Sequence, residues 1–176
     1  MRTKERNNLQ RIAVVGIFSA LSIILGKLFA FNIGELFRIS LENLPIIFIG
    51  IALGPIFGAV VGAVADLVGC LMVGYTINPV ITLGAVAIGG ISGIVSRLTK
   101  NISTGKRVFL SVLSAHIFGS VIIKSIGLSW FYGTDFWTLI PYRALNYVLI
   151  IALEYTIIYI LMKNKGILSS VRSLGE

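Results

Sequence analysis

Residues 55–73 read PIFGAVVGAVADLVGCLMV, a run of 19 residues in which Asp66 is the one charged side chain. A helix needs about 20 mostly apolar residues to cross the hydrocarbon core of a bilayer. The run has that length, and it begins with a proline. Proline suits the first turn of a helix, because backbone N–H groups there have no hydrogen-bond partner within the helix. It therefore predicts a membrane-spanning helix.

The rest of the chain has the same character. Of its 176 residues, 56% are hydrophobic and 12% are charged, whereas soluble domains carry about 25% charged residues. A chain of this size leaves much of its surface outside any core, so lipid is the simplest solvent for it. This composition excludes a soluble enzyme, a disordered tail and a secreted disulfide scaffold, and the single Cys70 excludes an internal disulfide.

Six apolar segments can be distinguished along the chain. They cover residues 12–31, 41–53, 55–73, 79–98, 107–126 and 141–163. The runs are continuous rather than alternating, which favours helices over a barrel. The prolines at 45, 55, 79 and 141 each lie near the start of a segment. We predict an all-α membrane protein, a bundle of six transmembrane helices in a single domain, 1–176.

Basic residues gather in the N-terminal tail, in the loop between the fourth and fifth segments, and in the C-terminal tail. With six spans these three regions share one side, and short loops rich in Lys and Arg stay in the cytoplasm. Both termini are therefore expected inside the cell. Orientation in the membrane and contact with anionic lipid headgroups explain the net charge of +8, and no nucleic-acid partner is expected.

Motifs for catalysis are missing. Residues 103–106, STGK, lack the glycine and the hydroxyl of a phosphate-binding loop. His116 is the only histidine, which excludes a multi-histidine metal site, and no Ser/His/Asp set can be assembled. We predict that the protein is not an enzyme and has no metal or cofactor.

Small residues recur every four positions on two segments, and such strips let helix backbones approach closely. They are Gly54, Gly58 and Gly62 on the third segment and Ala85, Gly89 and Gly93 on the fourth. These strips favour packing inside the bundle. A third strip, Ala13, Gly16 and Ala20 on the first segment, fits internal packing and a partner helix equally well.

Ionisable groups inside spans usually face a partner or a cavity. Asp66 lies deep in the third segment, and His116, Ser120 and Lys124 share one face of the fifth. Arg143, Tyr147 and Glu154 share a face of the sixth, with Asn146 adjoining it. His116 and Glu154 are expected to pair. Lys124 and Arg143 lie near the outer surface, where snorkelling to the interface is the alternative.

The outer loops are aromatic and cationic. They contain Arg38, Tyr75, Asn78, Trp130, Trp137 and Tyr142. A belt of aromatic residues at the membrane–water interface explains the aromatic side chains alone. It does not explain why cations lie at the same depth. Helices two, four and six would also begin on this side, and helix N-termini attract anions. We therefore predict an outward-facing pocket for a planar, anionic small molecule.

Three stretches resemble the substrate-binding subunits of the energy-coupling factor (ECF) vitamin transporters, also called S components. They are RISLENLP at 38–45, the glycines and aspartate of 54–69, and GYTINPVITLG at 74–84. The last stretch and Pro141-Tyr142-Arg143 are most similar to the folate-specific members. The resemblance covers residues 12–162.

The resemblance implies a subunit of a bacterial plasma membrane that captures folate outside the cell with high affinity. It would dock on a transmembrane coupling subunit that carries two ATPase subunits. The docking face of the family corresponds here to Ala13, Gly16 and Ala20. Glycine at 16 departs from the usual alanine but keeps the residue small.

For the ligand we hypothesise that Asp66 and Asn78 read the pterin edge. Tyr75, Trp130, Trp137 and Tyr142 would supply stacking walls, and Arg38, Lys124 and Arg143 would meet carboxylates or a pterin carbonyl, with Asn146 beside them. Alternatives remain: an S component for riboflavin, thiamine or a queuosine precursor, a small membrane channel or enzyme, or a structural scaffold.

Overall fold

The computed structural model describes the backbone of residues 2–27, 29–33 and 37–175, and the side chains of 9–27, 29–31, 39–171 and 173. The elements in order are α1 (Arg2–Lys27), β1 (Phe31–Ile33), β2 (Phe37–Ile39), α2 (Asn43–Leu53), α3 (Pro55–Val73), α4 (Pro79–Leu98), α5 (Thr104–Ala115), η1 (His116–Ile123), α6 (Lys124–Tyr132), α7 (Phe136–Lys163) and α8 (Lys165–Gly175). η1 is a π-helix that continues α5 directly into α6. β1 and β2 form an antiparallel hairpin.

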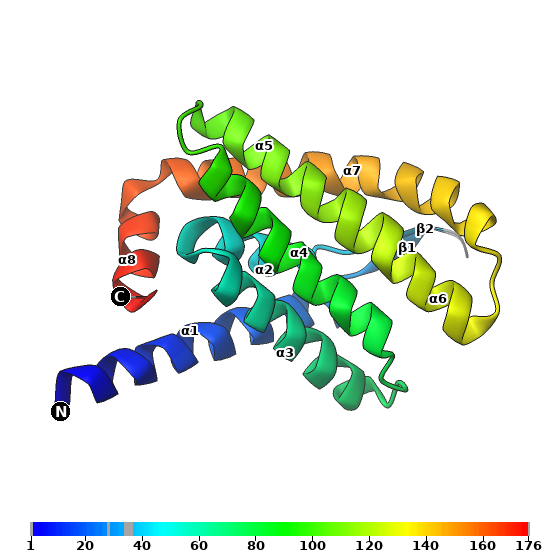
Figure 1. The fold of residues 1–176 in the computed structure, drawn as a ribbon, viewed down its shortest axis with the longest axis horizontal. Helices are drawn as coiled ribbons and strands as arrows, with labels where there is room; N and C mark the ends of the chain where they lie inside the picture. The colour runs from blue at the N-terminus through cyan, green and yellow to red at the C-terminus, as the bar shows by residue number, and fades with distance from the viewer. Residues whose placement is uncertain (1, 28, 34–36, 176) are drawn as a thin grey trace.

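Five helices are long and apolar enough to cross a membrane. They are Leu9–Lys27, Pro55–Val73, Pro79–Leu98, Thr104–Tyr132 and Phe136–Lys163. Figure 1 shows that they run broadly along the long axis of the molecule. The chain is therefore a helical membrane protein with five candidate spans among the residues that the structure describes.

The second predicted segment differs from a full span. α2 has 11 residues, or about 16 Å at 1.5 Å per residue, roughly half of the hydrocarbon thickness. Its residues from Asn43 to Ile51 are all buried. An apolar run of this length is more typical of a buried or re-entrant helix, and α2 is indeed enclosed by the longer helices rather than by lipid.

Several helix boundaries in the structure also differ from the predicted ones. The first helix ends at Lys27 rather than 31, since Phe31 already belongs to β1. The last span begins at Phe136, where the side chain of Asp135 accepts a hydrogen bond from the Thr138 amide at 2.8 Å. Pro141 thus lies inside α7 rather than at its start, because the Asp135 cap starts the helix earlier. α8 was not expected from the sequence.

α4 lies at the centre of the bundle and packs against α2, α3 and the continuous helix α5–η1–α6. The tightest approach is between Gly58 of α3 and Gly89 of α4. A Cβ built on Gly89 would lie 2.0 Å from the Gly58 carbonyl oxygen, and one on Gly58 would lie 2.5 Å from that of Gly89. The small-residue strips therefore serve internal packing, as predicted.

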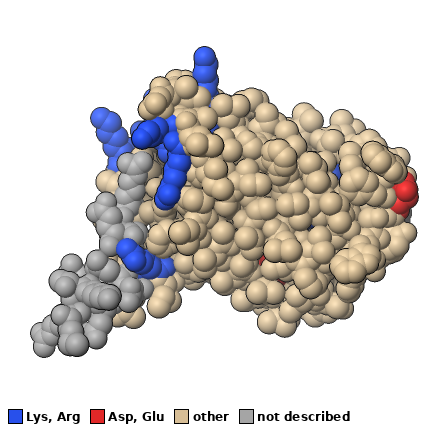
Figure 2. All heavy atoms as spheres, in the orientation of Figure 1, with Lys and Arg blue, Asp and Glu red and all other residues tan. Residues whose placement is uncertain are grey.

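The two termini lie at one end of the molecule, together with the loop that joins α4 to α5 (Figure 1). Figure 2 shows that Lys and Arg side chains gather at this same end on the visible face. Arg97, Lys100, Lys106, Lys163 and Lys165 are exposed. The polarity that the sequence indicates thus has a counterpart in the charge distribution of the molecule.

Candidate ligand-binding site

A cavity of about 300 Å³ lies towards the end opposite the termini, between α3, α6, α7 and the segments 40–43 and 75–78. Its size is at the lower end of small-molecule pockets. A smaller hollow of about 60 Å³ reaches between α1 and α3 and shares Lys27, Glu42 and Asp66 with it. The hairpin β1–β2 leads the chain from α1 into segment 40–43, which forms one wall.

Six of the residues predicted for the site line this cavity. They are Asp66, Tyr75, Asn78, Lys124, Arg143 and Asn146. Three predicted aromatics do not line it: Trp130, Trp137 and Tyr142 are 79%, 77% and 46% exposed. The side chain of Arg38 lies outside the described residues. The structure thus brings the polar and charged residues together and leaves these aromatics on the outer surface of α6 and α7.

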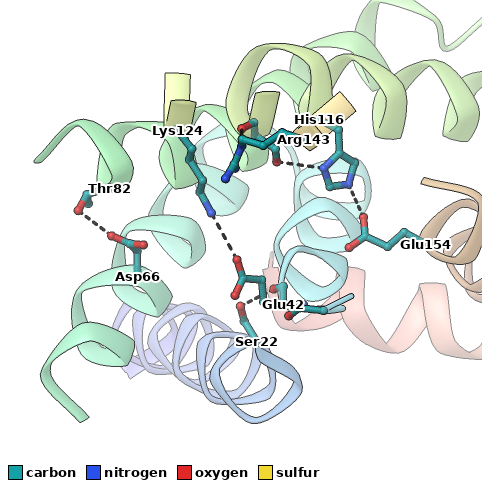
Figure 3. Close-up of polar contacts among 10 residues, drawn as sticks. Ser22, Glu42, Asp66, Thr82, His116, Lys124, Arg143 and Glu154 are labelled. Carbon is teal, nitrogen blue, oxygen red and sulfur yellow. Dashed lines mark hydrogen bonds and ion pairs between the residues drawn. The ribbon is translucent and has the colours of Figure 1, made fainter. Parts of the chain in front are cut away.

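Asp66 projects from α3 into the cavity, where its Oδ2 accepts a hydrogen bond from the Thr82 hydroxyl at 2.7 Å (Figure 3). One hydroxyl hydrogen uses only part of the accepting capacity of a carboxylate, since each oxygen has two lone pairs. The remaining lone pairs make Asp66 an acceptor suited to N–H groups of a ligand.

Asn78 has a structural task in addition to lining the cavity. It caps α4, with its Oδ1 accepting from the amides of Val80 at 3.0 Å and Ile81 at 3.4 Å. Its Nδ2 donates to the carbonyl of Gly127 at 2.9 Å. These bonds join the start of α4 to α6 and leave one amide hydrogen for a ligand.

Lys124 is buried, and its ammonium lies 3.5 Å from Oε1 of Glu42. Figure 3 shows the two side chains meeting across the space between α6 and the segment before α2. Lys124 therefore does not snorkel to an interface. Its charge is partly balanced within the protein, which leaves it less able than a free cation to hold an anion.

Arg143 has a different environment. Its Nε and Nη2 both donate to the main-chain carbonyl of Ser120, at 3.2 Å and 2.8 Å. Its guanidinium carbon lies 5.6 Å from the centre of the Tyr147 ring. Among the described side chains no carboxylate lies within ion-pairing distance of it. A carbonyl carries no net charge, so Arg143 keeps its positive charge for a ligand.

As expected from the sequence, His116 and Glu154 form a pair, which lies close to Arg143 and Tyr147 but outside the lining of the cavity. His116 Nε2 lies 2.6 Å from Glu154 Oε2, and both side chains are fully buried. The other ring nitrogen, Nδ1, lies 3.0 Å from the Ser120 hydroxyl. Neither His116 nor Glu154 lines the cavity, so the pair supports the site rather than contacting its contents.

Sequence reasoning missed two charged residues of the cavity, Lys27 and Glu42. Lys27 lies over the ring of Tyr75, with 5.2 Å from Nζ to the ring centre. It could have been found, because a lysine at the end of an apolar helix is an ionisable group inside a span. Glu42 precedes α2, but its approach to Lys124, 82 positions away, carries no local signal.

Among the described side chains that line the cavity, cations outnumber carboxylates. Lys27, Lys124 and Arg143 are opposed by Glu42 and Asp66. The N-terminal residues of α2 and α4 also reach the cavity. The N-terminus of α7 does not, since this helix begins seven residues before Arg143.

The third small-residue strip lies on an open face of α1. Ala13, Gly16 and Ala20 are exposed, while Val14 and Ser19 between them are buried against the bundle. A Cβ built on Gly16 would meet nothing within 4 Å. This part of α1 therefore has room for another helix backbone.

Comparison with known proteins gives three findings. The family model "ECF transporter, substrate-specific component" matches residues 10–171. A crystal structure of FolT bound with folic acid superposes with a TM-score of 0.67 and 27% sequence identity, covering 84% of this chain and 89% of that one. A 73-residue stretch is 34% identical to an uncharacterised MG313 homologue of Mycoplasma pneumoniae (strain ATCC 29342 / M129 / Subtype 1).

That stretch is 42% of this chain and only a quarter of the curated relative it matches, so it says little about function. The family model covers almost the whole chain, including every helix that lines the cavity. The fold match covers the same bundle. The chain belongs to the substrate-specific components of ECF transporters, and is thus a membrane transport subunit rather than an enzyme.

Proposed function

We propose that this chain binds folate at the outer face of a bacterial plasma membrane and delivers it by docking on an ATP-driven coupling module. The observation that carries the ligand assignment is the cavity around Arg143, whose charge is uncompensated by any described carboxylate. A related fold that holds folic acid supports it.

Folate suits the cavity because the two ends of the folate molecule differ in chemistry, as do the residues that line the cavity. The pterin is a flat ring with several donors and acceptors, and the carboxylate of Asp66 is placed to accept from its N–H groups. The glutamate tail carries two carboxylates, and Arg143 offers a planar fork that matches a carboxylate. We place the pterin towards Asp66 and Asn78 and the tail towards Arg143, with the ring of Tyr75 as a wall.

We further propose that α2 completes a six-helix bundle as a half-length segment, and that both termini lie in the cytoplasm. The exposed Lys and Arg residues at the end that carries the termini support this orientation. The cavity lies towards the opposite end, so it would open to the exterior, where a vitamin is captured.

For docking we propose the open face of α1 around Ala13, Gly16 and Ala20. Small residues let a helix of the coupling subunit approach the α1 backbone closely, and the space above Gly16 supports this. The resemblance to ECF transporters implies that the coupling subunit carries two ATPase subunits, and the absence of a nucleotide-binding loop from this sequence is consistent with that.

The test is calorimetry on the purified protein in detergent, with folic acid, riboflavin and thiamine titrated in parallel. We expect tight binding of folic acid and none of the other two, because riboflavin and thiamine lack paired carboxylates. Absorbance and mass of any compound that co-purifies provide an independent check. Tight binding of riboflavin or thiamine instead would replace folate with another vitamin while keeping the family role.

A further inference from the structure

We propose that the π-helix η1, anchored by the buried pair His116–Glu154, is the device that positions Arg143 in the cavity. This inference rests on the proposed function, in which Arg143 meets the ligand. It assigns His116, Ser120 and Glu154 as positioning residues, since none of them lines the cavity.

The first step is the change of helical register. The amide of Lys124 donates to the carbonyl of Gly119, five residues earlier, whereas an α-helical amide donates four residues back. An α-helical bond from the next amide, that of Ser125, would end at Val121. From this change of register we infer that the return from π to α geometry passes over the carbonyl of Ser120.

The second step is the use of this carbonyl. Both hydrogen bonds from the Arg143 guanidinium end on it, at 3.2 Å from Nε and 2.8 Å from Nη2. A regular α-helix would have engaged that oxygen within its own ladder. The π-helix thus supplies a neutral acceptor that fixes the plane of the guanidinium. A carboxylate partner would neutralise the positive charge of Arg143, whereas this carbonyl leaves the charge available to a ligand.

The third step is the anchor that holds η1 against α7. The Ser120 side chain is tied to His116 at 3.0 Å, and His116 to Glu154 at 2.6 Å. Figure 3 shows His116 between Arg143 and Glu154. The His116 ring also lies 4.8 Å from the ring of Tyr147, over which Arg143 is placed. η1 and α7 are therefore joined on both sides of Tyr147, at Arg143 and at Glu154.

Burial makes this anchor rigid. His116, Ser120 and Glu154 are all fully buried, and a polar contact is stronger where water is absent. An arginine side chain otherwise samples many rotamers, and fixing it on binding opposes affinity. An arginine held in place before the ligand arrives avoids that loss.

The test is a double-mutant cycle. The anchor is removed by changing both partners, His116→Phe with Glu154→Leu, because replacing both leaves no unpaired buried charge and keeps a ring against Tyr147. Folic acid affinity is measured by calorimetry with Arg143 present and in an Arg143→Gln background. We expect loss of the anchor to weaken binding about tenfold with Arg143 and less than about twofold without it.

Equal losses in the two backgrounds would mean that the anchor acts on the fold in general, and would overturn the proposal, as would no loss in either. Ser120→Ala, which removes the link to His116 but keeps the carbonyl, should weaken binding about threefold. Ser111→Ala is the matched control: it removes a buried hydroxyl on α5 that bonds the Arg107 carbonyl, and it should leave affinity unchanged.

A second readout needs no ligand. The Nε–H resonance of Arg143, assigned by its loss in Arg143→Lys, should be shifted and slowly exchanging in the free protein. It should move to the position of a solvated arginine when the anchor is removed, and an unmoved resonance would overturn the proposal. Failure of the unaltered protein to bind folic acid would count against the folate assignment alone, since this resonance then decides the positioning role.

Discussion

At the scale of single residues, the cavity separates two kinds of cation. Lys124 is balanced by Glu42 at 3.5 Å, and Arg143 is held by an uncharged carbonyl. We therefore expect a ligand carboxylate to be attracted more strongly to Arg143 than to Lys124. The difference is invisible in the sequence, where both residues are simply cations in apolar helices.

Replacing Arg143 by alanine should weaken folic acid binding tenfold or more, since losing one partner of a buried charge-assisted contact costs on the order of 2–5 kcal/mol. Isothermal calorimetry in detergent measures this directly. Arg143→Lys should fall between alanine and the unaltered protein, because lysine keeps the charge but not the fork. Unchanged affinity of the alanine variant would remove Arg143 from the site.

Asp135 provides a residue-scale prediction on pH. Hydrogen bonds from the side chain and then the amide of Thr138 hold the pKa of this carboxyl below its ordinary value of about 3.8. Because the folded pKa is depressed, the stabilisation that it contributes is complete above the ordinary pKa and is lost as pH falls through the folded one. The first turn of α7 should therefore loosen only in strong acid.

The Thr138 amide resonance should report this loosening, with a titration midpoint below 3.8. Thr138→Val removes the side-chain bond, the larger of the two causes, and should move the midpoint upward. A midpoint that is the same in both proteins would contradict the assignment of the hydrogen bond as the cause.

At the scale of elements, the short helix α2 needs help to end inside the bundle. Its final carbonyls would lie unpaired away from water, which is costly in a membrane protein. The carbonyl of Ile51 is instead approached at 3.4 Å by both Arg107 and Ser96. A cation from α5 at the C-terminus of α2 also opposes the negative end of the helix dipole.

The contact between α3 and α4 gives an element-scale prediction. Gly89→Ala places a Cβ 2.0 Å from the Gly58 carbonyl oxygen, so the helices must separate. Overpacking of this kind destabilises by about 1–3 kcal/mol, which a lower melting temperature in detergent would show. Gly90→Ala is the matched control, because its nearest contact is the Ala59 Cβ at 3.9 Å, and it should not lower the melting temperature.

At the scale of the whole molecule, the proposed function assigns ligand capture and docking to two different surfaces. The cavity lies between α3, α6 and α7, while Ala13, Gly16 and Ala20 lie on the open face of α1. Changes on one surface should leave the function of the other intact.

Gly16→Trp or Ala20→Trp should abolish folate uptake by cells that contain the coupling module, because bulk on α1 blocks close helix approach. Folic acid affinity of the purified variants should remain unchanged. Leu149→Trp serves as the control, since Leu149 is exposed on α7, and it should support uptake. Loss of binding together with uptake would indicate that the α1 strip packs internally.

Orientation in the membrane is the last whole-molecule prediction. In a Cys70→Ser background, the cysteine introduced by Lys100→Cys should react with an impermeant maleimide only after the cells are opened. The cysteine introduced by Thr134→Cys should react in intact cells, since the loop that joins α6 to α7 lies at the end opposite the termini (Figure 1). The reverse pattern would place the cavity on the cytoplasmic side.

Local composition was enough to establish the solvent of this protein, the positions of its main helices and its basic end. An apolar run of the length of 55–73 or 79–98 has no other stable form in lipid. The short α2 was less predictable, because its enclosure depends on neighbours far along the chain. The start of α7 was misplaced, since Pro141 and Asp135 are competing signals for one boundary.

Which polar residues meet depends on tertiary packing alone. The sequence indicated that Asp66, Lys124 and Arg143 face inward, but not that Lys124 reaches Glu42 or that Arg143 finds the Ser120 carbonyl. Those contacts depend on packing between distant segments and on a single change of helical register in η1, for which periodicity carries no signal. Helical pattern reports one face of one helix, whereas a binding site is made where several such faces meet.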